Sequence, residues 1–266
     1  HEFSGDIALR HDSYSTYGSE YFEYVVAHEI GHAIGLAHPR GYNGEGQQYL
    51  EAPSYLDDVS NTLMSYSTSE LWDPDYPDTI MPWDIEAVQY LYGYDAFNDG
   101  NTSYQYSPGQ YVFDAISDTG GYDTLDLSAF SSSLTVSLDP GNWISLGQTH
   151  SVTGGFGARN LYIPDNVYLE RLEGGSGSDN LTGNMYDNFL VGGQGNDTLV
   201  GGGGQDTAKF HGNFSDYSII EEVVSGITYL KVTDTRTGNV ASPDGITRLA
   251  QDIELLEFAD GTRTYA

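Results

Sequence analysis

The chain contains no cysteine, which excludes disulfide bridges, thiol nucleophiles and cysteine-ligated metals. Cross-links must come from elsewhere, and bound metal ions are the available option. Basic residues are also scarce, with 9 Lys+Arg against 39 Asp+Glu and a formal net charge of −30. Such a polyanion repels phosphate backbones and anionic lipids, so we expect neither nucleic acid nor membrane as a partner. The acidity does suit a binder of divalent cations, because Ca²⁺ relieves the repulsion between clustered carboxylates.

Long apolar segments are missing too, since no run approaches the roughly 18 residues of a membrane span. The 266 residues suffice for a sizeable core and allow one or two domains. The histidines outside the motif described next are isolated and read as surface or structural residues. No G-x-S-x-G pattern of a serine hydrolase appears, and the Gly-rich segments lack the lysine of a phosphate-binding loop.

One motif carries chemistry: it begins at His28 and reads H-E-x-x-H-x-x-G-x-x-H. On a helix, His28 and His32 leave the same face, as two ligands of a catalytic zinc would. Glu29 would sit beside the metal, where its carboxylate can take a proton from a bound water. Gly35 can end the helix with a positive-φ turn, so that His38 returns as the third ligand. Two histidines on a merely solvated helix face would not need Gly35 and His38 at this spacing.

The zinc motif resembles that of the metzincin metallopeptidases, and the segment Thr62–Tyr66 resembles their methionine-containing turn. The sequence Met-Ser-Tyr in this segment is similar to that of the serralysins, the secreted bacterial branch of the metzincins. The resemblance implies that Met64 is a hydrophobic floor beneath the metal. It also implies that the Tyr66 hydroxyl supports the oxyanion formed during peptide hydrolysis.

The resemblance implies an α+β metzincin-type catalytic domain over residues 1–94, followed by an all-β C-terminal domain of parallel β-roll and β-sandwich type over residues 95–266. Residues 6–10 read as a strand, and the following run as a loop to Glu20. We expect the catalytic domain to be partial, because the earlier strands and first helix of the serralysins have no counterpart. A second helix is predicted over residues 82–93, with Asp84 as N-cap and Gly93 as C-terminal stop.

A nonapeptide repeat fills residues 174–209 and is followed by a predicted capping segment, residues 210–266. Three of its four copies match G-G-x-G-x-D-x-U-x, apart from alanine at the apolar place of the last. The glycines permit a tight turn, and the apolar residue of a short strand points into the coil. A flexible linker would not keep this register. The four copies begin at Gly174, Gly183, Gly192 and Gly201. The leucines predicted to point inward are Leu181, Leu190 and Leu199.

Two repeats make one turn of a parallel roll, so calcium is predicted between repeats two apart. Asp179 and Asp197 would share one ion, while Asn188 and Asp206 would share another. The second site should be weaker, because an amide replaces a carboxylate. The predicted carbonyl ligands are Gly175, Gly177, Gly192, Gln194, Gly201 and Gly203. The pattern resembles the repeats-in-toxin (RTX) family, whose members include toxins, lipases and serralysins.

Two further acidic positions remain open. Asp123 and Asp126 lie in a stretch that resembles the start of the serralysin C-terminal domain, and they are either turn-forming aspartates or calcium ligands. Glu170 lies in a stretch that reads as a degenerate repeat before the first copy.

The sequence predicts a secreted, monomeric zinc endopeptidase with structural calcium, which acts on protein or peptide substrates. In this hypothesis Glu29 is the general base for a zinc-activated water, and Tyr66 assists. The alternative is a non-catalytic, calcium-binding secreted module, an inactive protease fragment.

Overall fold

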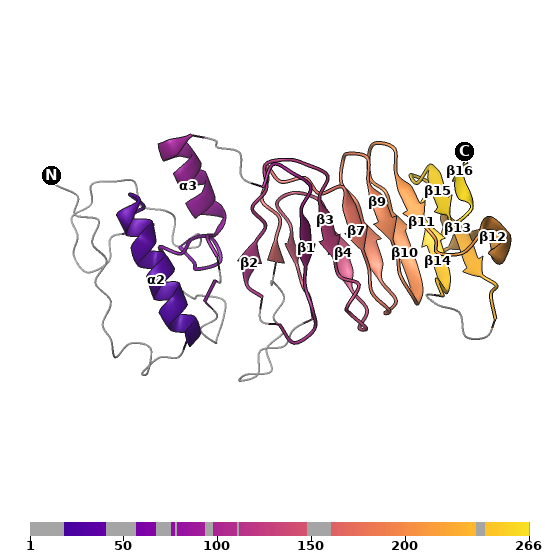
Figure 1. Ribbon diagram of the computed structural model, residues 1–266, viewed down its shortest axis with the longest axis horizontal. Coiled ribbons are helices and arrows are strands. Elements are labelled where there is room, and N and C mark those ends of the chain that lie inside the picture. Colours follow the sequence, from indigo (N-terminus) through magenta and orange to yellow (C-terminus); the bar gives the residue numbers. More distant parts are fainter. Residues whose placement is uncertain are drawn as a thin grey trace. The chain divides into compact units, whose positions relative to one another are not determined.

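The computed structural model describes these residues of the chain: 19–40, 57–67, 76–77, 79–93, 98–110, 112–147, 161–237 and 243–265. They form two compact units (Figure 1). The first contains the helices α2 (Ser19–Ala33) and α3 (Pro82–Tyr92) and the strand β2 (Asp114–Ala115). The described chain is mostly β with few helices, which is consistent with the predicted β-roll region. Neither described helix is long and apolar enough to cross a membrane.

Two predicted features, the strand at residues 6–10 and the domain boundary near residue 95, lie outside the described residues. Most of the predicted loop up to Glu20 also lies outside the described residues, and α2 begins at Ser19, one residue before the predicted end of that loop.

Helix α2 ends at the predicted turn. Gly35 has φ +99°, in the region that favours glycine, and its N–H donates to the carbonyl of His32 at 3.0 Å. The Leu36 N–H donates to the Gly31 carbonyl at 2.9 Å, so the last helical carbonyls are satisfied. The chain therefore turns back directly after the second histidine of the motif.

The second helix begins differently from the prediction. The N-cap of α3 is Met81, with Pro82 in the first helical position, and Asp84 lies three residues inside. The Asp84 carboxylate reaches back to accept the Met81 N–H at 3.0 Å, so it stabilises the same helix end from a different position. Gly93 does end the helix, with φ +91° and its N–H bonded to the Gln89 carbonyl.

The second unit consists of short strands in two main sheets. One sheet has the order β1 (Ser103–Gln105), β3 (Thr124–Asp126), β7 (Arg171–Glu173), β9 (Phe189–Val191), β11 (Thr207–Lys209), β15 (Leu255–Phe258) and β16 (Gly261–Thr264). The other has the order β12 (Tyr217–Val224), β13 (Ile227–Asp234), β14 (Ile246–Leu249), β10 (Asn196–Val200), β8 (Asn180–Thr182) and β4 (Thr135–Ser137). Two short strands, β5 (Trp143–Ile144) and β6 (Leu161–Tyr162), pair antiparallel.

The repeats form the predicted roll. Strand β8 of the first repeat pairs in parallel with β10 of the third, and β9 of the second pairs in parallel with β11 of the fourth. Successive repeats therefore alternate between the two sheets, and each strand lies beside the strand two repeats away. Gly193 shows why the turns are glycine-rich, since it has φ +88° and a Cβ there would lie 2.0 Å from the Gly175 carbonyl oxygen.

The core is a stack of side chains, one from each turn. Leu125, Leu172, Leu190, Ala208 and Leu256 occupy matching positions along one sheet, and all are buried. The matching column of the other sheet is Val136, Leu181, Leu199 and Leu249. Each buried leucine stabilises the roll by about 1.5–3 kcal/mol relative to an exposed one.

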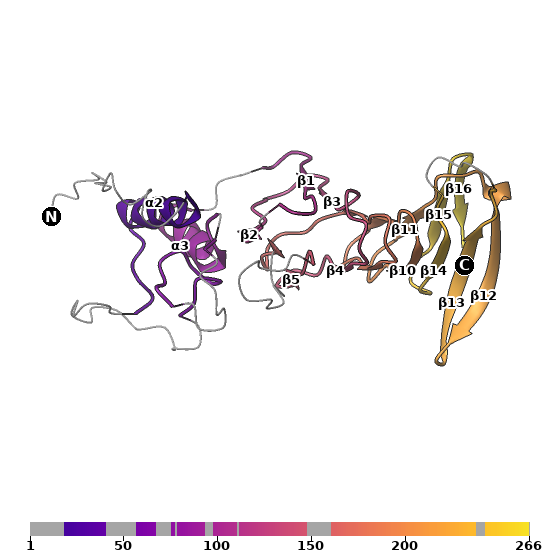
Figure 2. The ribbon, with the colours of Figure 1, turned by 90° about the horizontal axis from the view of Figure 1, so that it is seen from below.

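Antiparallel strands end the roll. β14 and β15 each add one more parallel strand, and β13 and β16 then pair with them antiparallel. The long hairpin of β12 and β13, with Ser225 and Gly226 at its turn, extends beyond the short strands (Figure 2). The parallel stacking direction therefore stops at this end.

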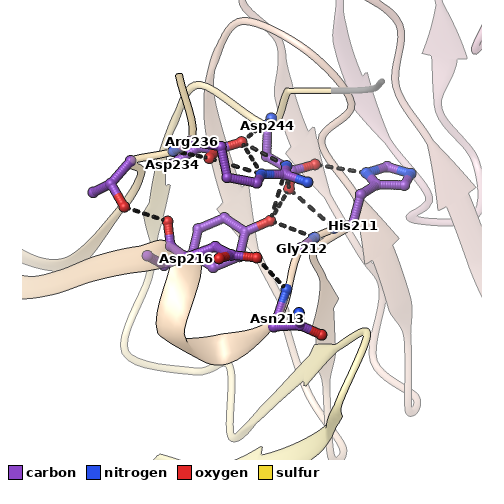
Figure 3. A network of polar contacts seen from close by, with 9 residues as sticks. His211, Gly212, Asn213, Asp216, Asp234, Arg236 and Asp244 are labelled. Atoms are coloured by element: carbon purple, nitrogen blue, oxygen red, sulfur yellow. Dashed lines mark hydrogen bonds and ion pairs between the residues drawn. The ribbon is translucent and has the colours of Figure 1, made fainter. Parts of the chain in front are cut away.

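A partly buried ionic network joins separate strands and loops of the capping segment (Figure 3). Asp244 is 3% exposed, and its carboxylate accepts hydrogen bonds from the hydroxyl of Tyr217 and from Nη2 of Arg236. Its other oxygen lies 2.6 Å from His211 Nδ1, and this contact raises the pKa of His211. Arg236 also pairs with Asp234 at 2.6 Å.

Asp244→Ala should lower the free energy of unfolding by about 1–3 kcal/mol, because the Tyr217 hydroxyl and His211 lose their acceptor while Arg236 keeps Asp234. Denaturant unfolding in saturating calcium measures this loss. Glu222→Ala is the control, because Glu222 makes ion pairs with Lys231 and Arg248 at the surface and its loss should matter far less. Equal effects of the two substitutions would contradict the role given to Asp244.

Candidate metal sites

Three histidines converge at the end of α2. The Nε2 atoms of His28 and His32 each lie 3.1 Å from Nε2 of His38. One ligand atom from each ring falls within 4.8 Å of the others. In the part of the chain that the structure describes, no other trio of histidine, cysteine or acidic residues comes together in this way.

The opposite ring nitrogens fix the tautomers. His28 Nδ1 lies 2.6 Å from the carbonyl oxygen of Leu63, and His32 Nδ1 lies 3.0 Å from that of Leu36. Each Nδ1 therefore carries the proton, and each Nε2 keeps a lone pair. Burial lowers the pKa of His28, which favours the neutral, metal-binding form. Lone pairs held this close repel unless a cation lies between them, and three imidazoles are a donor set that fits catalytic zinc.

The methionine turn packs directly beneath the helix. Met64 is 1% exposed, and a Cβ added to Gly31 would lie 2.5 Å from its sulfur. Gly31 is therefore needed where the turn meets the helix, although sequence reasoning treated it as an unspecified position of the motif. The signal was a glycine inside a helix, which is unfavourable unless close packing requires it.

Asp84 holds this turn in place, a role that sequence reasoning missed. Its buried carboxylate accepts hydrogen bonds from the Leu63 N–H at 2.7 Å and from the Thr62 hydroxyl at 2.5 Å. Leu63 in turn presents the carbonyl that orients His28. Burial raises the pKa of Asp84, while these hydrogen bonds oppose that shift.

The two residues predicted to act on substrate lie beside the histidines. The Tyr66 ring is 52% exposed and stacks on His28, with centroids 5.1 Å apart, and it also contacts His38 at 4.7 Å. Glu29 is half-buried on α2, and its charge raises the pKa of His28, against the larger effect of burial.

Asp84→Asn should weaken zinc binding about 10- to 100-fold, because the amide cannot accept both backbone N–H bonds and the hydroxyl bond as the carboxylate does. Competition with a chromogenic chelator measures the affinity. Glu86→Gln, an exposed change on the same helix, should have no effect. Wild-type affinity in Asp84→Asn would show that Asp84 does not position His28.

The structure brings together the acidic residues predicted along the roll. Asp197 accepts the N–H of Asp179 at 2.9 Å, and Asp206 accepts the N–H of Asn188 at 2.8 Å. Asp179 itself accepts the N–H of Leu134 one turn earlier, at 2.8 Å. The residues predicted to offer carbonyl ligands lie in the turns beside these side chains. The Gly175 carbonyl accepts the Gln194 N–H at 2.9 Å. The other predicted carbonyl ligands occupy equivalent turns, at Gly177, Gly192, Gly201 and Gly203.

Buried carboxylate oxygens without partners mark these edges. Oδ2 of Asp123, Asp197 and Asp206 makes no hydrogen bond within the described part of the chain. Burial raises the pKa of Asp197 to about 7 and those of Asp123 and Asp206 to about 6. A hard dication bound by carboxylate and carbonyl oxygens would supply the missing partner, so these residues fit calcium.

In the second repeat, side-chain amides make the hydrogen bonds of the turn. Asn188 Oδ1 accepts the Asn184 N–H at 2.6 Å. The side-chain nitrogens of Asn184 and Asn188 both donate to the Leu169 carbonyl, at 2.8 and 3.1 Å. These N–H groups occupy the acceptor that a cation would otherwise use. The expectation of a weaker site at this repeat is consistent with this arrangement.

Asp123 and Asp126, for which the sequence allowed either a turn-forming or a calcium-binding role, have different surroundings in the structure. Asp123 is fully buried, and its N–H donates to Glu170 at 2.7 Å, so the acidic ladder continues upstream of the repeats. Asp126 instead accepts the N–H of Ser128 at 2.9 Å, as a turn-forming aspartate does. Only Asp123 of this pair shares the environment of the repeat aspartates.

Comparison with known proteins places both regions. Residues 8–77 match the model of the reprolysin-like metallo-peptidase family M12B, and residues 173–208 match four copies of the RTX calcium-binding nonapeptide repeat. Serralysin of Proteus mirabilis is 33% identical over 190 residues, which are 63% of this chain and 36% of the relative. Serralysin B of Dickeya chrysanthemi is 35% identical over 181 residues, 60% of this chain and 36% of the relative.

Metalloprotease AprA of Pseudomonas entomophila (strain L48) is 33% identical over 192 residues, 63% of this chain and 38% of the relative. The match therefore spans well under half the length of each of these relatives. Within that span, the chain carries a reprolysin-like M12B peptidase region and RTX calcium-binding repeats, and it is homologous to the serralysins and AprA.

Proposed function

We propose that this chain is a secreted, zinc-dependent endopeptidase whose β-roll is stabilised by calcium. The observation that carries the proposal is the convergence of three Nε2 atoms at the end of the H-E-x-x-H helix, with two rings oriented by backbone carbonyls. The homology to serralysins supports the same reaction class. The partial match in length makes activity of this chain the point to test.

His28, His32 and His38 would hold the metal, which, when bound, supplies a Lewis acid that polarises the scissile carbonyl and acidifies a water. The Glu29 carboxylate accepts the proton of that water and passes it to the nitrogen of the leaving amine. The Tyr66 hydroxyl donates a hydrogen bond to the developing oxyanion. Donors of this type contribute about 2.7–4 kcal/mol to transition-state stabilisation.

The substrate class follows from the family and the charge. We propose a protein or peptide substrate, and the net charge of −30 disfavours polyanionic ones. We propose that the chain acts as a monomer. The second candidate is a non-catalytic calcium-binding module, an inactive protease fragment, which the unpartnered buried oxygens of Asp123, Asp197 and Asp206 support equally well.

Glu29→Gln should lower cleavage of a denatured protein substrate by about 10²–10⁴-fold, because the general base is lost while the helix and the histidines remain. Cleavage is followed in zinc and calcium, with zinc content measured in parallel. Glu23→Gln, an exposed change on the same helix, is the matched control. Undiminished cleavage by Glu29→Gln refutes the mechanism, and zinc binding without cleavage by the wild type favours the non-catalytic module.

The calcium-free chain should lose stability as the pH rises from about 4 to 7. The folded-state pKa values of Asp123, Asp197 and Asp206 lie above the ordinary 3.8, so the folded chain binds more protons than the unfolded chain in this window. The free energy of unfolding therefore falls as pH rises, and it is lowest above pH 7. Bound calcium should remove the loss, because it stabilises the ionised carboxylates.

Melting temperatures at pH 5 and 7.5, with and without calcium, measure this dependence. Asp197→Asn should flatten the calcium-free pH profile, whereas Asp139→Asn, at an exposed turn, should not. A calcium-free chain that melts at a higher temperature at pH 7.5 than at pH 5 would contradict the assignment.

A further inference from the structure

The roll repeats one hydrogen bond within its turns. In the first repeat, the Gly175 N–H donates to Asp179 Oδ2 at 2.9 Å. In the second, the Asn184 N–H donates to Asn188 Oδ1 at 2.6 Å. The sixth side chain of each of these repeats therefore accepts the N–H of the second residue in the same repeat.

The third repeat lacks this bond, because Asp197 Oδ2 has no partner among the described residues. The fourth repeat departs from the pattern as well. Its second residue, Gly202, donates instead to Asp252 Oδ2 at 3.1 Å, and Gly201 donates to Asp252 Oδ1 at 3.1 Å. Asp206, the sixth residue, thereby loses its internal donor. Its Oδ2 has no hydrogen-bond partner in the described structure, although Asp206 is 0% exposed. A buried carboxylate oxygen without a donor is costly unless a cation compensates it.

The capping turn presents oxygen atoms where a further repeat would. Leu255 pairs with Thr207 as Thr207 pairs with Phe189, so Glu254 occupies the sixth position of the next turn. Its Oε2 accepts the N–H of Asp206 at 2.9 Å, just as Asp206 accepts the N–H of Asn188. Glu254 therefore continues the acidic ladder beyond the last repeat.

A backbone carbonyl of the cap also takes the place that a repeat carbonyl has one turn earlier. A Cβ on Gly183 would lie 2.3 Å from both Asn188 Oδ1 and the Gly201 carbonyl oxygen. A Cβ on Gly201 would lie 2.2 Å from Asp206 Oδ2 and 2.6 Å from the carbonyl oxygen of Asp252. The Asp252 carbonyl thus replaces that of a repeat glycine, and the unpartnered oxygen of Asp206 points to the same small space.

The charges at this place favour a cation. Asp252, Glu254 and Asp187 all act on Asp206 and, with burial as the larger cause, raise its pKa. Asn188, the equivalent residue one turn earlier, is neutral and has both ends of its amide hydrogen-bonded. Excess negative charge is therefore concentrated between the fourth repeat and the cap, not one turn before.

We propose that a Ca²⁺ ion binds between the fourth repeat and the capping turn, held by Asp206 Oδ2, the carbonyl of Asp252 and the carboxylate of Glu254. Two of these residues lie beyond the segment 173–208 that matches the repeat family. The proposal rests on the calcium-binding function proposed for the roll. It makes the cap a participant in calcium binding.

Equilibrium dialysis and calorimetry on the full chain, with Ca²⁺ as the only titrant, test the site. Glu254→Gln retains an oxygen for the Asp206 N–H but removes the charge. It should bind one ion fewer, or bind one ion about tenfold or more weakly, with the other ions unchanged. Asp260→Asn is the control, because Asp260 lies in the same cap at an exposed position. Equal binding by Glu254→Gln and wild type would overturn the site.

Two measurements separate the remaining outcomes. If the wild-type chain binds no calcium, the proposed calcium-binding function is wrong. If it binds calcium and Glu254→Gln leaves that binding unchanged, only the proposed site at the cap is wrong. Hydrogen exchange of the wild-type chain needs no variant, and calcium should slow exchange at the amides of Asp206 and Leu255. Unchanged exchange at these two amides on saturation with calcium would also overturn the site, even if the variant failed to fold.

Discussion

The roll depends on buried carboxylates that the protein itself does not fully satisfy. Except for the second repeat, the turns place an acidic side chain at their edge, and its carboxylate accepts an N–H from the turn before, as Asp197 does from Asp179. This hydrogen bond aligns the turns but leaves some oxygens, such as Asp197 Oδ2, buried without a donor. Folded geometry and cation binding are therefore one equilibrium, because the turns that stack the strands also assemble the oxygen ligands.

The histidine cluster follows a different principle, because hydrogen bonds within the protein orient two of its three rings. Asp84 fixes the turn around Leu63, the Leu63 carbonyl fixes His28, and Gly31 lets that turn approach the helix. None of these contacts requires an ion. The chain thus combines a preorganised nitrogen site with oxygen sites that remain electrostatically unfavourable until a cation binds.

Local sequence rules predicted much of this architecture. The nine-residue period gave the roll, the inward leucines and the parallel pairing, because one glycine-rich turn and one short strand recur in register. Gly35 gave the end of α2, because a positive φ favours glycine. Long-range roles were not predictable in this way. Asp84 looked like a helix cap from its neighbours, whereas its function depends on Thr62 and Leu63, which are distant in sequence.

The amide-satisfied second repeat makes the roll uneven in its dependence on cations. Asn184 and Asn188 close their turn onto the Leu169 carbonyl with neutral hydrogen bonds, and these contacts need no ion. The third and fourth repeats instead hold buried carboxylate oxygens without a partner, those of Asp197 and Asp206. The geometry of the second repeat therefore depends less on bound cations than that of the two repeats that follow it.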